Sequence, residues 1–183
     1  MKKALLFSLI FLFSTLFAYA YETIIIHYPD NEKWEKAYYK KRNGEALLQY
    51  VPSGQTSENW TRSIVIHSYK DSAYPINIFI NNNARKLTKA NPTGQYKTLK
   101  MTENDAMLTR CTNDYKEIKA QCEFLRATKA HEGIITVHYI NRNKKDFMDN
   151  YTMWFQTIRN AKFYNSYYRD ERTFDKSEYF ELW

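Results

Sequence analysis

WEKAYYKKRNGEALLQYV, residues 34–51, is the most informative part of this chain. Asn43-Gly44 lies between two segments of apolar and aromatic residues, and this dipeptide favours a tight β-hairpin because both of its residues tolerate positive φ. We therefore predict strands over 34–41 and 45–51. Pro52-Ser53-Gly54 then ends the second strand.

The segments on either side of this hairpin continue the strand pattern. Residues 22–28 (ETIIIHY) form a β-branched run that ends at Pro29-Asp30-Asn31. Residues 61–69 alternate, with Ile64 and Ile66 on one side and Val65 and His67 on the other. This pattern predicts a strand that is covered on both faces.

The apolar period changes to that of a helix in two places. Pro75 begins a helix over 75–89 that ends before Asn91-Pro92, and Asn143 is the N-cap of a second helix over 144–163. The apolar stripe of the first is Ile76, Phe79, Ile80, Ala84 and Leu87, and that of the second is Phe147, Tyr151, Trp154, Phe155, Ile158 and Ala161.

The remaining segments predict further strands. They cover residues 96–101, 106–111, 122–128 and 134–140, and the last two pair around a turn at 130–133. Hairpin-linked strands with two amphipathic helices predict an α+β fold, an antiparallel β-sheet against which both helices pack. Residues 21–183 form a single domain, and its C-terminal tail, residues 165–183, is charged and aromatic without a clear period.

The first twenty residues resemble an export signal. Met1-Lys2-Lys3 is positively charged, residues 4–17 are largely apolar, and Ala18-Tyr19-Ala20 is a cleavage site. We expect cleavage after Ala20, a periplasmic or secreted protein and no transmembrane segment in the mature chain. The alternative is an uncleaved N-terminal anchor.

The charge of the mature chain is moderately basic. Without Lys2 and Lys3, 25 basic side chains remain against 20 acidic ones, a net charge of +5. Small basic clusters lie at 40–42 and at Arg142, Lys144 and Lys145. They are either solvated or attract acidic envelope partners such as lipid headgroups or phosphorylated glycans. Nucleic acid is not an expected partner, because the basic residues form no concentrated stripe.

Cys111 and Cys122 are the only two cysteines. In an exported chain such a pair is expected to form a disulfide. A redox pair more often has the Cys-x-x-Cys spacing, and a zinc site needs two further ligands, although no histidine lies within a few residues of either cysteine.

Residues 50–61, YVPSGQTSENWT, resemble a signature of small exported proteins from legionellae and related gammaproteobacteria. Cys122-Glu-Phe-Leu-Arg126 and Val137-His-Tyr139 are similar to the later half of these proteins, which are largely uncharacterised. The resemblance implies an exported protein, and the order of elements is similar to the PsbP-like fold, a sandwich of sheet and helices. It implies no catalytic residues.

The same motif has two physical interpretations. A structural corner explains it if Pro52 and Gly54 turn the chain and Trp60 enters the core. A ligand-contacting loop explains it if Gln55, Glu58 and Asn59 offer hydrogen bonds beside Trp60.

Paired tyrosines form a second candidate binding feature. Tyr38-Tyr39 and Tyr167-Tyr168 each place one ring outward in extended structure. Exposed aromatic rings near Asn, Lys and Arg suit glycan or protein surfaces.

No common catalytic, metal or cofactor motif is present in the sequence. We therefore expect no catalytic residues, metal or cofactor, and a non-enzymatic envelope protein that binds a protein, lipid or glycan partner. The alternative is a periplasmic hydrolase-like enzyme whose site is assembled around the strand histidines His67 and His138.

Overall fold

A computed structural model of the chain describes residues 22–70, 72–130, 133–165 and 179–181. The expected export signal, residues 1–20, lies outside the described residues. So do Tyr167-Tyr168 and most of the C-terminal tail.

The helices and strands follow one another along the chain with short connections. Their bounds are β1 (Glu22–Ile25), β2 (Trp34–Arg42), β3 (Glu45–Pro52), β4 (Arg62–Lys70), α1 (Ile76–Ala90), β5 (Gln95–Met101), β6 (Asp105–Thr112), β7 (Gln121–Lys129), β8 (Gly133–Asn141), α2 (Lys144–Asp149), α3 (Tyr151–Asn160), β9 (Lys162–Asn165) and β10 (Tyr179–Glu181).

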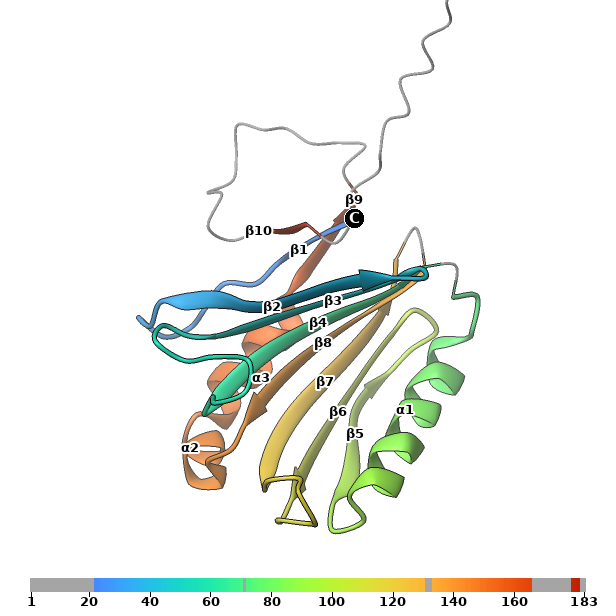
Figure 1. The fold of residues 1–183 in the computed structure, drawn as a ribbon. Helices are drawn as coiled ribbons and strands as arrows, with labels where there is room; N and C mark the ends of the chain where they lie inside the picture. Colours follow the sequence, from blue (N-terminus) through green and yellow to red (C-terminus); the bar gives the residue numbers. More distant parts are fainter. Residues whose placement is uncertain (1–21, 71, 131–132, 166–178, 182–183) are drawn as a thin grey trace, which may run out of the picture.

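The described residues form a seven-stranded sheet in the order β2-β3-β4-β8-β7-β6-β5 and a three-stranded sheet in the order β10-β1-β9. Neighbouring strands are antiparallel throughout. The larger sheet is strongly twisted, so that β2 and β5 run in very different directions (Figure 1). The predicted α+β class with an antiparallel sheet is confirmed.

The predicted hairpin at Asn43-Gly44 is present. Asn43 has φ 51° and Gly44 has φ 76°, as a two-residue hairpin turn of the I′ type requires. The turn sets the register, in which Arg42 lies opposite Glu45 and Lys40 lies opposite Leu47. The register in turn decides which side chains of β2 and β3 share a face.

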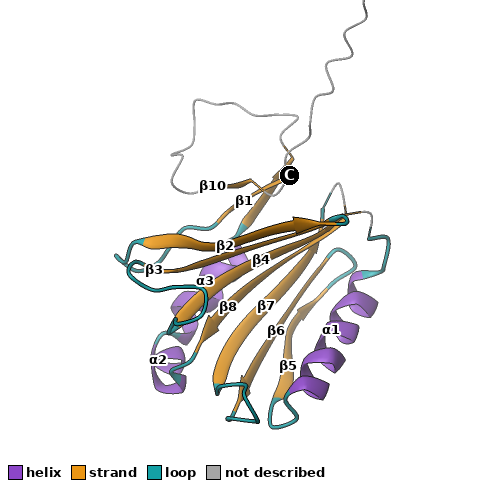
Figure 2. Cartoon of the chain, viewed as in Figure 1, coloured by secondary structure: helices purple, strands orange, loops and turns teal. Residues whose placement is uncertain are grey.

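Helices cover opposite faces of the large sheet (Figure 2). On β7, Phe124 packs in the cluster that contains α2 and α3, whereas the next residue, Leu125, packs in the cluster that contains α1. Side chains of a strand alternate between faces, so each helical layer receives every second residue. We call the two sides of the sheet the α3 face and the α1 face.

The main core lies on the α3 face and is rich in aromatic rings. Trp154 of α3 stacks on Tyr139 of β8 with ring centroids 3.9 Å apart, and its edge meets Trp34 of β2 at 5.6 Å. Phe124 and Phe147 pack at 4.8 Å. Aromatic pairs of this kind add about 1 kcal/mol each beyond the apolar area they bury.

The second predicted helix is divided and ends earlier than expected. The N-cap prediction is confirmed, because Oδ1 of Asn143 accepts a hydrogen bond from the backbone N–H of Asp146 at 3.0 Å. Asn150 then interrupts the helix: its side-chain amide donates to the carbonyl oxygen of Asp146 at 3.1 Å and to a carboxylate oxygen of the same residue at 2.9 Å. The chain leaves the helix at Ala161, whose ψ is 130°.

The end of the predicted helix is instead a strand. Residues 162–165 form β9 and pair antiparallel with β1, and β1 also pairs with β10 in the tail. The predicted strand over 22–28 ends at Ile25, although Ile26 is still buried. The tail therefore contains a strand that the sequence pattern did not indicate.

Arg126 on β7 connects the sheet to the end of α3. Its guanidinium donates to three backbone carbonyls, those of Ile158 at 3.1 Å and of Arg159 and Ala161 at 2.8 Å. It also forms a two-pronged ion pair with Asp105, with both N···O distances 3.0 Å. Carbonyls at a helix C-terminus lack intrahelical partners, so one side chain both caps α3 and orients the start of β9.

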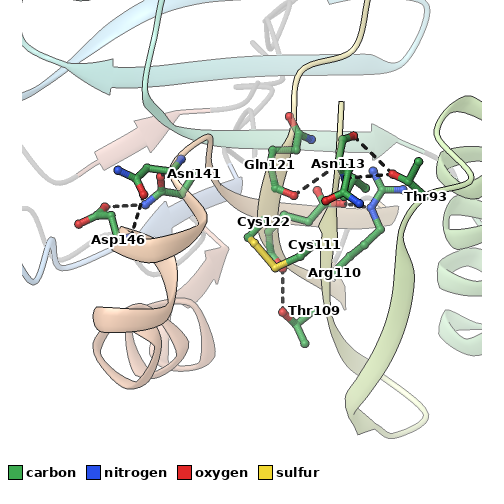
Figure 3. The surroundings of a disulfide bond; sticks show 12 residues. Thr93, Thr109, Arg110, Cys111, Asn113, Gln121, Cys122, Asn141 and Asp146 are labelled. Carbon is green, nitrogen blue, oxygen red and sulfur yellow. Dashed lines mark hydrogen bonds and ion pairs between the residues drawn. A yellow bond between two sulfur atoms is a disulfide. The ribbon is translucent and has the colours of Figure 1, made fainter. Parts of the chain in front are cut away.

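Cys111 and Cys122 form the predicted disulfide between directly opposite residues of β6 and β7 (Figure 3). Beside it, the hydroxyl of Thr109 donates to the carbonyl oxygen of Glu123 at 3.0 Å. The bridge closes a loop with a sequence separation of 11 residues.

Removing the disulfide should destabilise the protein while leaving the fold intact. We expect the Cys111→Ala/Cys122→Ala variant to lose about 3 kcal/mol of unfolding free energy, the value expected for a closed loop of this size. Urea titration followed by tryptophan fluorescence measures this loss. Reduced wild-type protein is the control, because it loses the bridge without losing side-chain volume. An unchanged midpoint in both samples would contradict a stabilising role.

Candidate binding groove beside α1

Helix α1 covers only part of its face of the sheet. It contacts β5, β6 and β7, and its buried residues pack in a small cluster with those strands and β8. The α1 face of β2 and β3 has no helix above it, and on β4 the helix reaches the end of the strand, where Tyr69 meets Phe79 (Figure 1). The expectation that β4 is covered on both sides is therefore wrong on this face, where Val65 and His67 are only half-buried.

A first hollow of 530 Å³ lies over the open strands. Its lining comes from alternate residues of β2 and β3, from the hairpin turn and from β4. The lining residues are Tyr38, Lys40, Arg42, Asn43, Glu45, Leu47 and His67. All of the strand residues in this set share the α1 face, as their register requires.

Three aromatic rings in contact lie between this hollow and α1. His67 stacks on Tyr69 with centroids 4.0 Å apart, and Tyr69 meets Phe79 of α1 edge-on at 5.0 Å. Burial, together with the nearby charge of Glu45, raises the pKa of Tyr69 to about 12. The position of His67 is thus fixed by the packing of α1 on the sheet.

Two further hollows border α1, one on each side of the helix. The second, of 600 Å³, lies between the hairpin and the helix and shares Asn43 and Glu45 with the first. The third, of 640 Å³, includes Tyr96 of β5 and shares Arg85 with the second. The first two hollows adjoin each other on the β4 side of α1, and we call these two together the α1 groove, whereas the third lies on the β5 side of the helix.

Among the described residues, five basic residues and one acidic residue line the α1 groove. The basic residues are Lys40, Arg42, Lys70, Arg85 and Lys86. Glu45, the acidic residue, lies 3.3 Å from Nε2 of His67. No ion pair links Lys40, Arg42, Arg85 or Lys86 to a carboxylate within the described part of the chain. Unneutralised cations in one groove create a local positive potential that attracts anions.

The two strand histidines lie on the same face but in different surroundings. His67 lies opposite Thr136, and His138 lies opposite Val65, so the histidines are diagonal neighbours on β4 and β8. Burial lowers the pKa of His67 below its ordinary 6.5 and His138 lowers it further, while Glu45 opposes the shift. His138 has its own carboxylate, with Nδ1 3.5 Å from an oxygen of Glu123. His138 does not line any of the three hollows.

Glu123 belongs to a buried ion pair with Arg110. Nε of Arg110 lies 3.1 Å from a carboxylate oxygen of Glu123, although these two atoms are not aligned as a hydrogen bond. Arg110 also donates to the hydroxyl of Tyr96 at 3.2 Å. Leaving one member of a buried pair uncompensated is strongly destabilising, so we assign Arg110 and Glu123 a structural role that fixes Tyr96.

The corner at residues 52–61 lies at the other end of β3 from the α1 groove, about 20 Å away along the strand. The side chain of Gln55 spans this corner. Its Oε1 accepts a hydrogen bond from the backbone N–H of Thr61 at 2.7 Å, and its Nε2 donates to the hydroxyl of Thr61 at 3.0 Å. Glu58 and Asn59 are exposed. Binding by these residues stays a prediction, although the hydrogen bonds of Gln55 fit a structural corner.

Trp60 does not enter the core as expected. It is half-buried beneath Arg142, whose guanidinium carbon lies 3.8 Å from the ring centroid. Arg142 also donates to the carbonyl oxygen of Trp60 at 3.0 Å. Cation–π stacking on Arg142 takes the place of core packing for this ring.

Tyr38 and Tyr39 are both exposed, with 41% and 48% of their surfaces accessible, whereas the sequence predicted one outward ring in this pair. They point to opposite faces of the sheet, and only Tyr38 lines the α1 groove. Sequence reasoning missed Arg85 and Lys86, which reach the groove from α1. The cluster at 40–42 was noticed, but only strand alternation shows that Lys40 and Arg42 share a face with Tyr38.

Among the described residues there is no group of three or more His, Cys, Asp or Glu side chains that could hold a metal ion. In the same part of the chain, none of the helices has the length and apolar character needed to cross a membrane. Comparison with models of known protein families, with curated proteins and with solved structures finds no match. The geometry of the site therefore has to carry the functional argument.

His67 should titrate below its ordinary pKa. A group whose folded-state pKa is depressed contributes stability that is full above the unfolded value, here 6.5, and is lost as the pH falls through the folded value. NMR titration of the His67 ring should give a midpoint below 6.5, and the His138→Gln variant should raise it by removing a neighbouring positive charge. A wild-type midpoint at or above 6.5 would contradict the burial of this ring.

Proposed function

We propose that this chain is an exported, non-enzymatic envelope protein that binds an acidic partner in the α1 groove. The observation that carries the proposal is that, among the described residues, five basic side chains and one acidic side chain surround a single groove. Binding requires only a complementary surface, and this one combines charge with exposed aromatic rings.

The disulfide supports the compartment. A disulfide between adjacent strands indicates a non-cytoplasmic location, because cytosolic thiols are kept reduced. The apolar N-terminal segment and its Ala18-Tyr19-Ala20 site support a cleaved export signal, and therefore a periplasmic or secreted location. Acidic lipid headgroups and acidic glycans are the anionic surfaces of such compartments.

The sequence resemblance is part of the same proposal. Residues 50–61 resemble the signature of small exported gammaproteobacterial proteins, and a membership of that group fits an envelope location. A sheet with helices on both faces also agrees with a PsbP-like sandwich. Fold similarity transfers no activity, so the groove remains the basis of the function.

The enzymatic alternative has one specific observation in its favour, the contact of His67 and Glu45 at the edge of the first hollow. A histidine beside a carboxylate is half of a common hydrolytic arrangement. The described residues that line this hollow include no Ser, Thr or Cys to act as a nucleophile. This composition favours binding over covalent hydrolysis.

Charge reversal in the groove tests the proposed function. We expect Arg85→Glu/Lys86→Glu to elute from a carboxylated or sulfated resin at clearly lower salt than the wild type. Exposed charge pairs contribute through screened electrostatics, so the effect should shrink as ionic strength rises. Elution conductivity at neutral pH is the measurement.

The matched control is Lys97→Glu/Lys144→Glu. These lysines are exposed, and Lys97 shares the α3 face with Thr109 while Lys144 lies on α2. Both double variants have the same net charge, so they separate a specific groove from simple ion exchange. Identical elution of the two variants would overturn the proposal. Turnover of an acidic glycan or lipid that His67→Gln abolishes would establish the enzymatic alternative instead.

A further inference from the structure

We propose that the partner of the α1 groove is the surface of a membrane that contains anionic phospholipids, and that the exposed side of α1 lies against this surface. The inference rests on the proposed function and names the partner of the same groove. Its supports are the cations on both sides of α1, two exposed apolar side chains in line with them, and the way the helix is held on the sheet.

Helix α1 is attached to the sheet by one side, which leaves its other side exposed. Ile76, Phe79 and Ile80 are buried against the strands. Among the described elements, α1 is the outermost on its face of the sheet (Figure 2). Exposed residues at intervals of three or four form a stripe along one side of a helix. Here that stripe, which we call the α1 crest, consists of Ile78, Asn82, Arg85 and Lys89.

Basic side chains lie on the crest and on both of its flanks. Arg85 lines the second and the third hollow, Lys86 lines the second on the β4 side, and Lys89 lines the third on the β5 side. All three are exposed, and none forms an ion pair with a carboxylate of the described residues. The helix itself contains no acidic residue. A small soluble ligand in one hollow contacts one flank, whereas a broad anionic surface contacts both, and this distribution fits the second case.

The hollows on either side of the crest suit lipid headgroups. Their volumes are 600 and 640 Å³, and sites of this size hold one small ligand. Asn82 lines the hollow on the β4 side and Asn81 the hollow on the β5 side. An amide can donate to phosphate oxygens and can pair with headgroup hydroxyls. With cations beside the amide, each hollow can accept one headgroup that contains a phosphate.

Two apolar side chains distinguish this surface from a site for a soluble anion. Ile78 on the crest is 46% exposed, and Tyr74, four residues before it, is 61% exposed. An exposed isoleucine adds little to the binding of a polyanion in water, but it is stabilised when it enters the apolar boundary of a bilayer. Tyrosine is enriched at the same depth because it has an apolar ring and a polar hydroxyl. Apolar and basic groups in one stripe therefore favour an anionic membrane as the partner.

The packing of α1 makes this contact shallow and electrostatic. The apolar stripe of the helix belongs to the core and cannot turn toward lipid without loss of the fold. Two partly exposed apolar side chains are too few to hold the protein on a bilayer without charge attraction. Attraction to anionic lipid falls off within a Debye length, about 8 Å at physiological ionic strength. We therefore expect binding to require anionic lipid and to weaken as salt rises.

Sedimentation with vesicles tests the inference. The mature chain, residues 21–183, is used so that the apolar N-terminal segment cannot bind lipid by itself. At low salt we expect vesicles of phosphatidylglycerol and phosphatidylcholine to bind at least about tenfold more tightly than vesicles of phosphatidylcholine alone, with the difference shrinking as salt is added. Equal binding to both kinds of vesicle, or binding to neither, would overturn the inference.

Matched variants test whether the contact lies on the α1 crest. Ile78→Ser should weaken binding to the anionic vesicles about fivefold. Met148→Ser should not, because Met148 is 55% exposed but lies on α2, on the opposite face of the sheet. Lys89→Glu should weaken binding at least about tenfold, and Lys144→Glu, the same change of net charge on α2, should weaken it less. Equal effects within either pair would place the membrane elsewhere and overturn the inference.

The same variants separate failure of this inference from failure of the proposed function. If vesicles do not bind but Arg85→Glu/Lys86→Glu still shifts elution from the acidic resin, the membrane surface is wrong and the α1 groove binds a soluble anion. If only that double variant weakens vesicle binding, while Ile78→Ser and Lys89→Glu do not, a headgroup occupies the groove alone and the crest is wrong. If neither vesicles nor resin respond to any of these variants, both proposals fail.

Discussion

The pairing of β4 with β8 is the contact on which the rest of the fold depends. It joins two antiparallel meanders, β2 to β4 and β5 to β8, into one sheet. Because β5 then lies at the far edge, the connection from β4 must pass over the three strands between them, and α1 covers most of that path. The helix lies over β5, β6 and β7 and is too short to cover β2 and β3, which lie at the opposite edge of the sheet, as well. The open part of the face, and with it the α1 groove, follows from this topology.

Local signals in the sequence predicted most of the fold because hairpins and strand alternation are local properties. Asn43-Gly44 fixed one register by its backbone preference alone, and Cys111 and Cys122 indicated a bridge by their export context. The predicted end of α3 was wrong because it depends on a contact between residues far apart in the sequence. Phe163 and Tyr164 suit the aromatic stripe of a helix as well as a strand, and only pairing with β1 near the start of the described chain selects the strand.

The candidate site was less predictable than the fold, because its residues meet only through tertiary structure. Lys40, Lys41 and Arg42 are adjacent in the sequence. Because strand side chains alternate, Lys40 and Arg42 share one face of the sheet and Lys41 lies on the other. Arg85 and Lys86 join them because α1 returns over the sheet. Sequence reasoning placed His67 and His138 in strands, but it had no means of showing that each contacts a different carboxylate.

Alternation along β2, β3 and β4 has a consequence for how this protein can change. In these strands one set of side chains packs in the core with α3, and the other set, apart from Tyr69 beside Phe79, lies on the groove side without a helix above it. Mutations in the groove set therefore leave the core set undisturbed, and selection can retune ligand preference without loss of foldability. Strands β6 and β7 lack this freedom, because Leu108 and Leu125 are packed beneath α1. A single sheet thus contains an evolutionarily constrained half and an adaptable half.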